Sequence, residues 1–363
     1  MYVVIMAGGG GTRLRPVSTA DRPKPFLPLL PTGETLLERT VRRLRGDELE
    51  RGGRPIDVYV VASAAYAPLV ASQVPDATVV IEPEGRNTAA AIALAALAIE
   101  READDVMVVL PADHRIDPAR EGLFREVLGA AADGLAGGSF GIARPLVTLG
   151  VQPTFAATQY GYLRPRLADG HVVDGLQAYP LEAFEEKPTP DRAATLVAMP
   201  GVAWNAGMFL WRRGSIGAAL ERFAPDVVEA VSRGLASGDM AAAYGTINPR
   251  SIDYAVMEPA AAAGDVVMAT LDVGWTDVGT WSVLLDVLGA TGIEGGVVEA
   301  GTAVETRAGD VVIDRHEGAL SARAVGDDTM VTERPVALLR GAREALPVVQ
   351  ALLDRCAAAE IRA

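Results

Sequence analysis

The sequence predicts an α/β fold built on a mixed, mainly parallel sheet with helices on both faces, followed by a small β module and a terminal helix. Strand-like and helical segments alternate through the first third of the 363-residue chain, which is typical of a parallel sheet covered by helices. Residues 2–6 form a continuous apolar run, as expected for a strand buried on both faces. After about residue 290, short β-like segments separated by Gly and Asp replace this pattern.

The first elements can be placed in order. A helix is expected over residues 35–44, because its apolar residues share one face, Thr35 and Glu38 fit a capping box, and Gly46 follows. The remaining elements are expected as strands at 57–62, 78–81 and 106–110, and helices at 88–102 and 343–357.

The length and composition favour two domains. A chain of 363 residues fits about two domains at roughly 100–200 residues each, and its 50% hydrophobic content is sufficient for a sizeable core. We expect a main catalytic domain over residues 1–285 and the β module with its helix over residues 286–363.

The charge excludes some classes of partner. A net charge of −14 disfavours nucleic acid and anionic membranes, so any anionic ligand must be held by a local arrangement. Cys356 is the single cysteine, which excludes an intramolecular disulfide. No leader peptide is visible, and the longest apolar stretch, 88–99, is shorter than the about 20 residues of a membrane span. We expect a cytoplasmic protein.

The first strand is followed by "AGGGGTRLRP", residues 7–16. Glycine lets backbone N–H groups approach a phosphate closely. The string is not a P-loop, and a dinucleotide fingerprint would need glycine where Leu14 stands. A plain turn is disfavoured because consecutive glycines cost conformational entropy and Arg13 follows at once. The loop is therefore expected to bind phosphate.

The longer string "GGGGTRLRPVSTADRPKPFLPL" resembles the G-G-x-G-T-R-L-x-P signature of the sugar-1-phosphate nucleotidyltransferases, with Lys24-Pro25 as the matching K-P. The resemblance implies a Rossmann-like, GT-A-like catalytic domain and a loop that wraps a nucleoside triphosphate. It implies catalytic roles for Arg13 and Lys24 as charge partners of the phosphates. The other nucleotide contacts it implies here are Ala7, Gly8, Gly9, Gly11 and Thr12.

The chemistry of that family fits the residues. One phosphate attacks the α-phosphorus of a nucleotide and diphosphate leaves, so charge neutralisation and in-line positioning are the main tasks. No covalent nucleophile is required, and no Ser-His or Cys-His constellation was found in the sequence.

The segment "EPEGRNTAAAIALAA" resembles the E-P-x-x-R-N-T-A motif of mannose-1-phosphate guanylyltransferases. In related enzymes this loop reads the base, which implies nucleotide contacts by Glu82, Pro83, Arg86, Asn87 and Thr88. Asn87 is equally suited to cap the following helix, and both roles can hold.

Two aspartates resemble the family's metal ligands. Asp113 follows a buried strand in "PADH", and Asp277 lies in "VGWTDVGTW", similar to W-x-D-x-G-T. The resemblance implies that both bind Mg²⁺ and that Asp113 also meets the nucleotide. Mg²⁺ usually takes one or two carboxylates with phosphate oxygens and water. The two residues lie 164 positions apart, so only the fold can bring them together. A purely structural aspartate is the alternative for each. His114 is expected to form local hydrogen bonds.

Two strings resemble the family's sugar-binding segments. "YGYLRP" is similar to T-G-Y-G-Y-I, with Gln159 replacing the first glycine and Gly161 matching the second. "FEEKP" matches F-x-E-K-P, which implies that Glu186 holds sugar hydroxyls and that Lys187 meets the sugar phosphate as a catalytic residue. A solvated strand end is the alternative for this pair.

Two further strings complete the resemblance. "WNAGMFLW" matches W-N-S-G-M-F with Ala206 in place of serine. Asn205 has a donor and an acceptor for paired sugar hydroxyls, and Gly207 allows close approach of the backbone. In "SIDYAVME", Ser251 or Asp253 could cap a helix, and a sugar contact by Asp253 is an equal alternative.

The resemblance implies transfer of GMP from GTP to α-D-mannose 1-phosphate, giving GDP-mannose and diphosphate by Mg²⁺-assisted in-line attack. The base and the sugar rest on resemblance alone. The alternatives are another sugar 1-phosphate, such as a manno-heptose 1-phosphate, another nucleotide, or an inactive regulatory homologue. The last is disfavoured because the charged site residues are all present. A nicotinamide-dependent oxidoreductase is disfavoured because the fingerprint fails.

The tail also resembles the guanylyltransferase ending, which implies a left-handed β-helix-like module that helps dimers form. We therefore expect a homodimer. The fused isomerase domain of longer relatives is not expected.

Overall fold

The computed structural model describes residues 1–9, 11–50 and 55–362, so Gly10 of the glycine string lies outside the described residues. The chain forms two compact units. Unit 1 comprises Met1–Gly8, Arg43–Pro111 and Ile116–Trp275, and unit 2 comprises Gly9–Arg42, Ala112–Arg115 and Thr276–Ala363. Each unit is assembled from segments far apart in the sequence. The predicted domain boundary after residue 285 stays a prediction.

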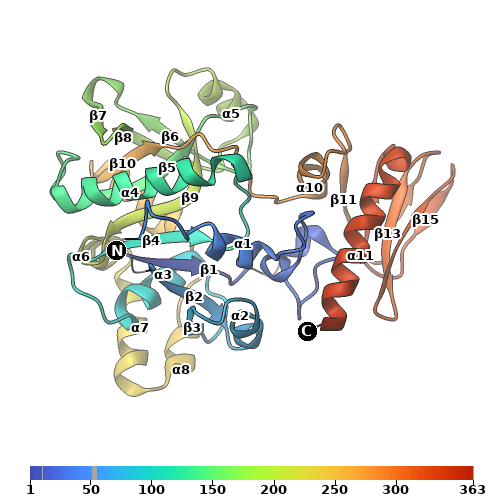
Figure 1. Cartoon of the computed structure of the whole chain (residues 1–363), viewed down its shortest axis with the longest axis horizontal. Coiled ribbons are helices and arrows are strands. Elements are labelled where there is room, and N and C mark those ends of the chain that lie inside the picture. Colours follow the sequence, from blue (N-terminus) through green and yellow to red (C-terminus); the bar gives the residue numbers. More distant parts are fainter. Residues whose placement is uncertain (10, 51–54, 363) are drawn as a thin grey trace. The chain divides into compact units, whose positions relative to one another are not determined.

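Unit 1 is built on one large sheet (Figure 1) with the strand order β3-β2-β1-β4-β9-β5-β10-β8-β6, in which β7 pairs with β8 and β6 also pairs with β9. The strands are β1 Tyr2–Met6, β2 Asp57–Ser63, β3 Thr78–Glu82, β4 Val106–Pro111, β5 Leu146–Val151, β6 Gly161–Pro165, β7 His171–Val173, β8 Leu176–Glu186, β9 Ala203–Arg212 and β10 Val266–Thr270.

The predicted mixed sheet is confirmed, but it is less parallel than expected. The strands β3, β2, β1 and β4 run parallel, as the alternating pattern predicts. Beyond β4, β5 and β10 pair parallel, and the other pairings among the described strands are antiparallel. Antiparallel strands do not need a crossover helix between neighbours, which explains the irregular pattern of the middle of the sequence.

Helices cover both faces of this sheet. Tyr2 and Val4 belong to the apolar core shared with α3, α6 and α7, whereas Val3 and Ile5 are fully buried outside that core. Since neighbouring side chains of a strand point to opposite faces, both faces of β1 are covered, and Figure 1 shows α3 and α4 on opposite sides of the central strands. The helices of unit 1 are α2 Ala67–Gln73, α3 Asn87–Ala98, α4 Glu121–Gly137, α5 Pro190–Val197, α6 Arg213–Phe223, α7 Pro225–Ser237, α8 Met240–Tyr244, a π-helical turn Asp253–Met257 and α9 Glu258–Ala262.

Unit 2 joins the segment after the glycine loop to the end of the chain in one apolar core. Leu14, Leu27 and Leu36 pack in the same cluster as Trp281 and Leu352. Helix α11 lies along β13 and β14 in this unit (Figure 1). The elements are α1 Leu36–Arg42, α10 Trp281–Val287, β11 Gly295–Val298, β12 Ala303–Glu305, β13 Val311–His316, β14 Ala319–Ala324, β15 Thr329–Val331, β16 Val336–Leu339 and α11 Leu346–Arg362.

The β-rich module is confirmed, but its resemblance to a left-handed β-helix is wrong. Its described strands form the sheets β11-β16-β13-β14 and β12-β15, in which neighbouring strands pair antiparallel. A β-helix stacks parallel strands from successive turns, whereas β13 and β14 are joined directly by the turn at Glu317 and Gly318. Short antiparallel hairpins have the same spacing of Gly and Asp in sequence, so the pattern did not distinguish them.

The predicted helices form with small differences in length. Helix α1 carries the predicted capping box: the amide of Thr35 donates to Glu38 Oε2 at 2.6 Å, and the amide of Glu38 donates to Thr35 Oγ1 at 3.2 Å. Helix α3 ends at Ala98 and α11 extends to Arg362. Within the described ranges, no helix combines the length and the apolar character that crossing a membrane requires.

Candidate active site

A cavity of about 320 Å³ lies within unit 2, and predicted nucleotide-binding and metal-binding residues line it. The glycine loop forms one part of its wall, and Lys24 and the two aspartates form another. The lining residues are Gly9, Gly11, Thr12, Arg13, Leu14, Lys24, Asp113, His114, Asp277 and Gly279.

A short backbone bridge explains how the two aspartates meet. The amide of Arg115 donates to the carbonyl of Thr276 at 2.8 Å, and the amide of Thr276 donates back to the carbonyl of Arg115 at 3.0 Å. Asp277 follows Thr276 directly and Asp113 lies two residues before Arg115, and both line the same cavity. The fold therefore brings together the pair that the sequence separates.

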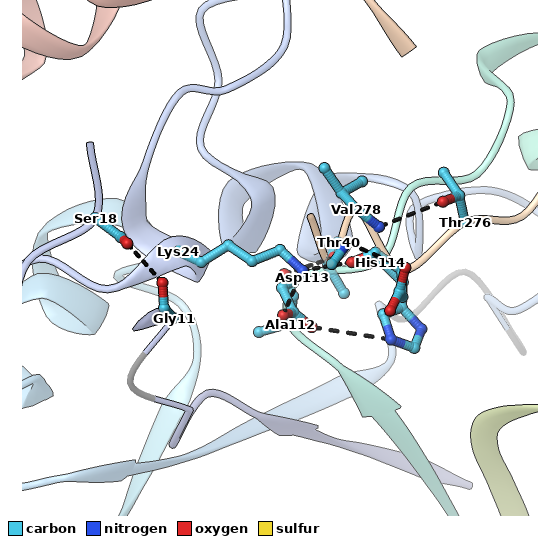
Figure 2. Close-up of polar contacts among 11 residues, drawn as sticks. Gly11, Ser18, Lys24, Thr40, Ala112, Asp113, His114, Thr276 and Val278 are labelled. Atoms are coloured by element: carbon cyan, nitrogen blue, oxygen red, sulfur yellow. Dashed lines mark hydrogen bonds and ion pairs between the residues drawn. The ribbon is translucent and has the colours of Figure 1, made fainter. Parts of the chain in front are cut away.

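Lys24 connects the two aspartates, and Figure 2 shows its side chain directed toward Asp113. Its Nζ forms an ion pair with Asp113 Oδ2 at 2.7 Å and also donates to the main-chain carbonyl of Asp277. The Lys24 side chain is only 8% exposed. Burial raises the pKa of Asp113, but the charges of Lys24 and His114 and the hydrogen bond from Lys24 outweigh burial, so this pKa lies below its usual value. The Asp113 carboxylate is ionised at neutral pH.

The donor set fits a hard divalent cation. Asp277 Oδ1 accepts the amide of Gly279 at 3.0 Å, and a Cβ at position 279 would lie 2.5 Å from Asp277 Oδ2, so a larger residue there would displace this carboxylate. No group of three His, Cys, Asp or Glu side chains that could hold a metal occurs in the described ranges. Two carboxylates on one cavity match Mg²⁺, which completes its shell with phosphate oxygens and water.

The glycine loop is held in a conformation that requires glycine. Gly11 has a φ of 57°, and a Cβ there would lie 2.8 Å from the amide nitrogen of Lys24. Ser18 Oγ donates to the carbonyl of Gly11 at 2.5 Å, a contact drawn in Figure 2. Thr12 and Arg13 are exposed at the cavity. Ser18 lies inside the quoted motif, but nothing in the local pattern marked it as the residue that holds the loop.

The predicted sugar-phosphate residues come together in unit 1. Gly161 of β6 pairs in register with Glu186 of β8, and a Cβ at Gly161 would lie 2.5 Å from Glu186 Oε2. Lys187 Nζ forms an ion pair with Glu186 Oε1 at 2.7 Å. Asn205 Nδ2 donates to Asp253 Oδ1 at 2.8 Å. The Cβ at Gly161 would also lie 3.4 Å from Asn205 Cβ, so four separate segments come together in one cluster.

The charges of this cluster are strongly coupled. Burial raises the pKa of Asp253 to about 7, and the charge of Glu186 adds to the rise, while Lys187 and the bond from Asn205 oppose it. Burial lowers the pKa of Lys187, but its bond with Glu186 and the charges of Glu186 and Asp253 raise it overall. Lys187 is therefore a fixed cation beside a carboxyl that titrates near neutrality. The helix cap predicted for Ser251 or Asp253 is made by Ser251, whose Oγ accepts the amide of Tyr254 at 3.4 Å.

The predicted base-reading residues form a third group, also in unit 1. Glu82 is buried and accepts Tyr244 Oη at 3.0 Å and the amide of Arg86 at 3.3 Å. Arg86 binds Glu84 and the carbonyls of Gly245 and Ile247. These side chains therefore already have protein partners, and Tyr244 was missed by the sequence because it lies 162 positions from Glu82.

The remaining predicted nucleotide contacts surround this group. Asn87 opens α3 with a φ of 67°, and its side chain accepts the amide of Thr88 at 2.8 Å rather than one further along the helix. Thr88 Oγ1 accepts the amide of Ile252 at 2.8 Å, next to Asp253. The others have these positions: Ala7 donates its amide to Val61, a Cβ at Gly8 would lie 3.3 Å from Glu82, and Pro83 follows Glu82 at the end of β3.

Comparison with known proteins decides the family. The family model described as Nucleotidyl transferase matches residues 2–291. The chain belongs to the nucleotidyl transferase family. The mannose-1-phosphate guanylyltransferase of Escherichia coli (strain K12) is 34% identical over 98% of this chain and 73% of its own length. One from Sinorhizobium fredii (strain NBRC 101917 / NGR234) is 37% identical over 77% of this chain and 53% of its own length.

Solved structures support this placement of the nucleotidyl transferase chain. A crystal structure from Thermus thermophilus, named a mannose-1-phosphate geranyltransferase, is 33% identical with a TM-score of 0.64, covering 79% of this chain and 78% of that one. A Helicobacter pylori structure named a mannose-6-phosphate isomerase, 22% identical with a TM-score of 0.59, covers 76% of this chain and 100% of that one and shows the shared fold. The family resemblance expected from the motifs is confirmed.

Proposed function

We propose that this protein transfers GMP from GTP to α-D-mannose 1-phosphate, giving GDP-mannose and diphosphate. The observation that supports it most strongly is the cavity where Lys24, Asp113 and Asp277 meet beside the glycine loop. The choice of guanine and mannose rests on the similarity to the Escherichia coli mannose-1-phosphate guanylyltransferase.

Different residues of this chain would bind the two substrates. The glycine loop would bind the triphosphate through its amides, and Arg13 and Lys24 would offset its charge. An oxygen of the sugar phosphate attacks the α-phosphorus and diphosphate leaves, so positioning of the two anions supplies much of the catalysis. Lys187 would hold the sugar phosphate, and Glu186, Asn205 and Asp253 the sugar hydroxyls.

Asp113 and Asp277 would hold Mg²⁺, since both carboxylates line the cavity. A bound Mg²⁺ neutralises phosphate charge and orients the phosphates for displacement. Lys24 would keep the Asp113 carboxylate ionised, because its charge lowers the pKa of that carboxyl.

A substrate panel tests the proposal. Release of diphosphate is measured for GTP and other nucleoside triphosphates with mannose 1-phosphate, manno-heptose 1-phosphate and glucose 1-phosphate, with and without Mg²⁺. We expect GTP with mannose 1-phosphate to give the highest kcat/KM, and only with the metal present. A higher value for another pair would contradict the proposed specificity.

We also propose a homodimer in the cytoplasm, without nucleic acid or membrane partners. These proposals rest on the family resemblance and on the net charge of −14. Sedimentation should give twice the chain mass of 37.9 kDa, and the mass of a single chain would contradict the dimer.

A further inference from the structure

Thr148 is a fully buried polar residue on β5, inside unit 1. Its Oγ1 donates to Asn205 Oδ1 at 2.8 Å and lies 3.4 Å from the carbonyl oxygen of Met208. No motif marked this threonine, which follows the buried Leu146 and Val147 along the strand. A buried hydroxyl is costly unless it is hydrogen-bonded. The presence of a threonine at this buried position therefore suggests that its bond to Asn205 has a role.

An irregularity between β5 and β9 creates the contact. The pairing passes from Thr148 with Phe209 to Gly150 with Asn205, so β9 contains extra residues at this point. Gly207, one of those residues, has a φ of 64°. Its amide donates to Asn205 Oδ1 at 3.1 Å instead of joining the ladder. The bulge therefore turns a backbone donor toward the Asn205 side chain.

These partners fix the orientation of the Asn205 amide. The N–H of Gly207 can only donate, so the atom facing it must be the carbonyl oxygen of the side chain. That oxygen accepts two bonds, from Thr148 and from Gly207, which use both of its lone pairs. On the other side, Nδ2 donates to Asp253 Oδ1 at 2.8 Å. The second N–H of Nδ2 has no partner in the part of the chain that the structure describes.

We propose that Thr148 is a positioning residue that fixes the Asn205 side chain with its carbonyl turned inward, so that Asn205 offers the sugar phosphate one N–H donor and no acceptor. A substrate hydroxyl that accepts this bond can donate its own proton to a carboxylate, and Glu186 and Asp253 both lie beside Asn205. Fixing the amide excludes the reverse orientation, in which Asn205 would accept instead of donate. The inference rests on the proposed function for its choice of ligand, mannose 1-phosphate.

Kinetics of two substitutions test the role. Thr148→Val removes the hydroxyl at similar size, and Thr148→Ser keeps it. We expect Thr148→Val to raise the KM for mannose 1-phosphate about tenfold, the effect of about one lost hydrogen bond, with the KM for GTP unchanged. Thr148→Ser should restore the KM to within about threefold, since hydrogen bonding is kept. Thr306→Val, which removes a buried hydroxyl that bonds Gly326 and Asp328, is the matched control and should leave both KM values unchanged.

A purely structural role predicts a different result. An unchanged KM for mannose 1-phosphate in Thr148→Val would overturn the inference. So would Thr148→Ser being as impaired as Thr148→Val, or equal increases in both KM values.

A second measurement does not depend on the Val variant folding. The sequence contains Asn87, Asn205 and Asn248 as its asparagines, so ¹⁵N-asparagine labelling gives few side-chain amide signals, and Asn205→Asp assigns the one of interest. Mannose 1-phosphate is added in the presence of GTP without divalent cation. We expect one Asn205 side-chain proton, the free one, to shift on binding while the other, bonded to Asp253, stays in place. Saturation that moves neither proton would overturn the inference.

Failure of the proposed function gives a separate result. If the unaltered protein does not transfer GMP to mannose 1-phosphate, the proposed function fails. The KM measurements on the Thr148 variants and the NMR titration are then repeated with the sugar 1-phosphate that the panel shows to be the best substrate. The outcomes that support or overturn the role of Thr148 stay the same.

Discussion

Lys24 and Asp113 place a paired positive and negative charge in the wall of the cavity. The Lys24 ammonium is buried and satisfied by the Asp113 carboxylate and by the main-chain carbonyl of Asp277. Removing the carboxylate leaves the charge of the buried ammonium uncompensated, which costs more than the ion pair contributes. The Asp113 carboxylate therefore contributes more to the stability of the folded protein than the Asp277 carboxylate, although we propose that both hold the metal.

This difference leads to a prediction for Asp113→Asn and Asp277→Asn. Both variants should lose at least about a hundredfold in kcat/KM, because each removes a carboxylate from the proposed metal. Only Asp113→Asn should clearly lower the melting temperature, since Asp277→Asn keeps the carbonyl that Lys24 uses. Diphosphate release and thermal unfolding measure the two effects. Asp272→Asn, at an exposed aspartate, is the control, and unchanged turnover in both site variants would contradict the metal site.

Asp253 gives a prediction for pH. Its pKa in the folded protein, about 7, lies above its ordinary value of 3.8, so the folded state holds this proton more tightly than the unfolded state. Its contribution to stability is full below about pH 4 and is lost as the pH rises through 7. Asp253→Asn removes this dependence. The free energy of unfolding of the variant minus that of the unaltered protein should therefore increase between pH 4 and pH 7, and urea unfolding that shows a constant difference would contradict the raised pKa.

The positions of the candidate site residues were largely predictable because short motifs mark single residues. The clusters around Lys24 and around Glu186 consist of residues that the motifs singled out. Partners on other strands were not predictable. Thr148 and Asn205 lie 57 positions apart, and the sequence could not show that Asn205 Oδ1 accepts two internal bonds at the β5–β9 bulge. The functional roles themselves stay predictions.

At the level of elements, the bulge in β9 depends on one glycine. Gly207 has a φ of 64°, which side chains with a Cβ adopt at a cost of about 1–2 kcal/mol. The amide that this conformation turns toward Asn205 is part of the proposed sugar site. A local backbone choice therefore sets the orientation of a functional side chain.

Gly207→Ala should lower both stability and activity. We expect a loss of about 1–2 kcal/mol in the free energy of unfolding and a higher KM for mannose 1-phosphate. Gly217→Ala is the matched control: this glycine lies within α6, and a Cβ there meets no atom within 4 Å, so it should be neutral or stabilise by about 0.5–1 kcal/mol. Equal effects of the two substitutions would contradict the argument.

Element types were predicted better than their pairing. The apolar run of β1 and the capping box of α1 are local signals, and both elements form where they were expected. Whether a strand pairs parallel or antiparallel depends on the path of the chain between partners. The sequence therefore did not reveal that β9 pairs antiparallel with β4, and it suggested a β-helix where β13 and β14 form a hairpin.

At the level of the whole molecule, the end of the chain supports the cavity loop. In unit 2, Arg315 donates to the carbonyls of Pro16 and Val17, and Arg355 donates to that of Leu29. The apolar core of this unit combines the segment around Leu27 with α10, β13 and α11. The change of composition near residue 290 suggested an appendage, but the sequence could not show that this segment shares a core with the loop.

Truncation after residue 285 should therefore remove activity. It would expose the apolar side chains of Leu14 and Leu27, which pack against residues beyond that point, and the glycine loop would lose its support. We expect the shortened protein to aggregate or to fail to bind GTP, as judged by gel filtration and calorimetry. The single substitution Leu352→Ala in the same core should lower the free energy of unfolding by about 2–5 kcal/mol. Gln350→Ala, at an exposed position, is the control and should change it little. A truncated protein with unaltered turnover would contradict this account.

The direction of the phosphoryl attack tests the central claim most directly. The protein is given GTP, Mg²⁺ and mannose 1-phosphate carrying ¹⁸O in all its phosphate oxygens, and the products are read by ³¹P NMR and mass spectrometry. The account predicts GDP-mannose with ¹⁸O in the bridge between its two phosphorus atoms, together with diphosphate free of the isotope. An unlabelled bridge, labelled diphosphate, or no GDP-mannose at all would contradict it.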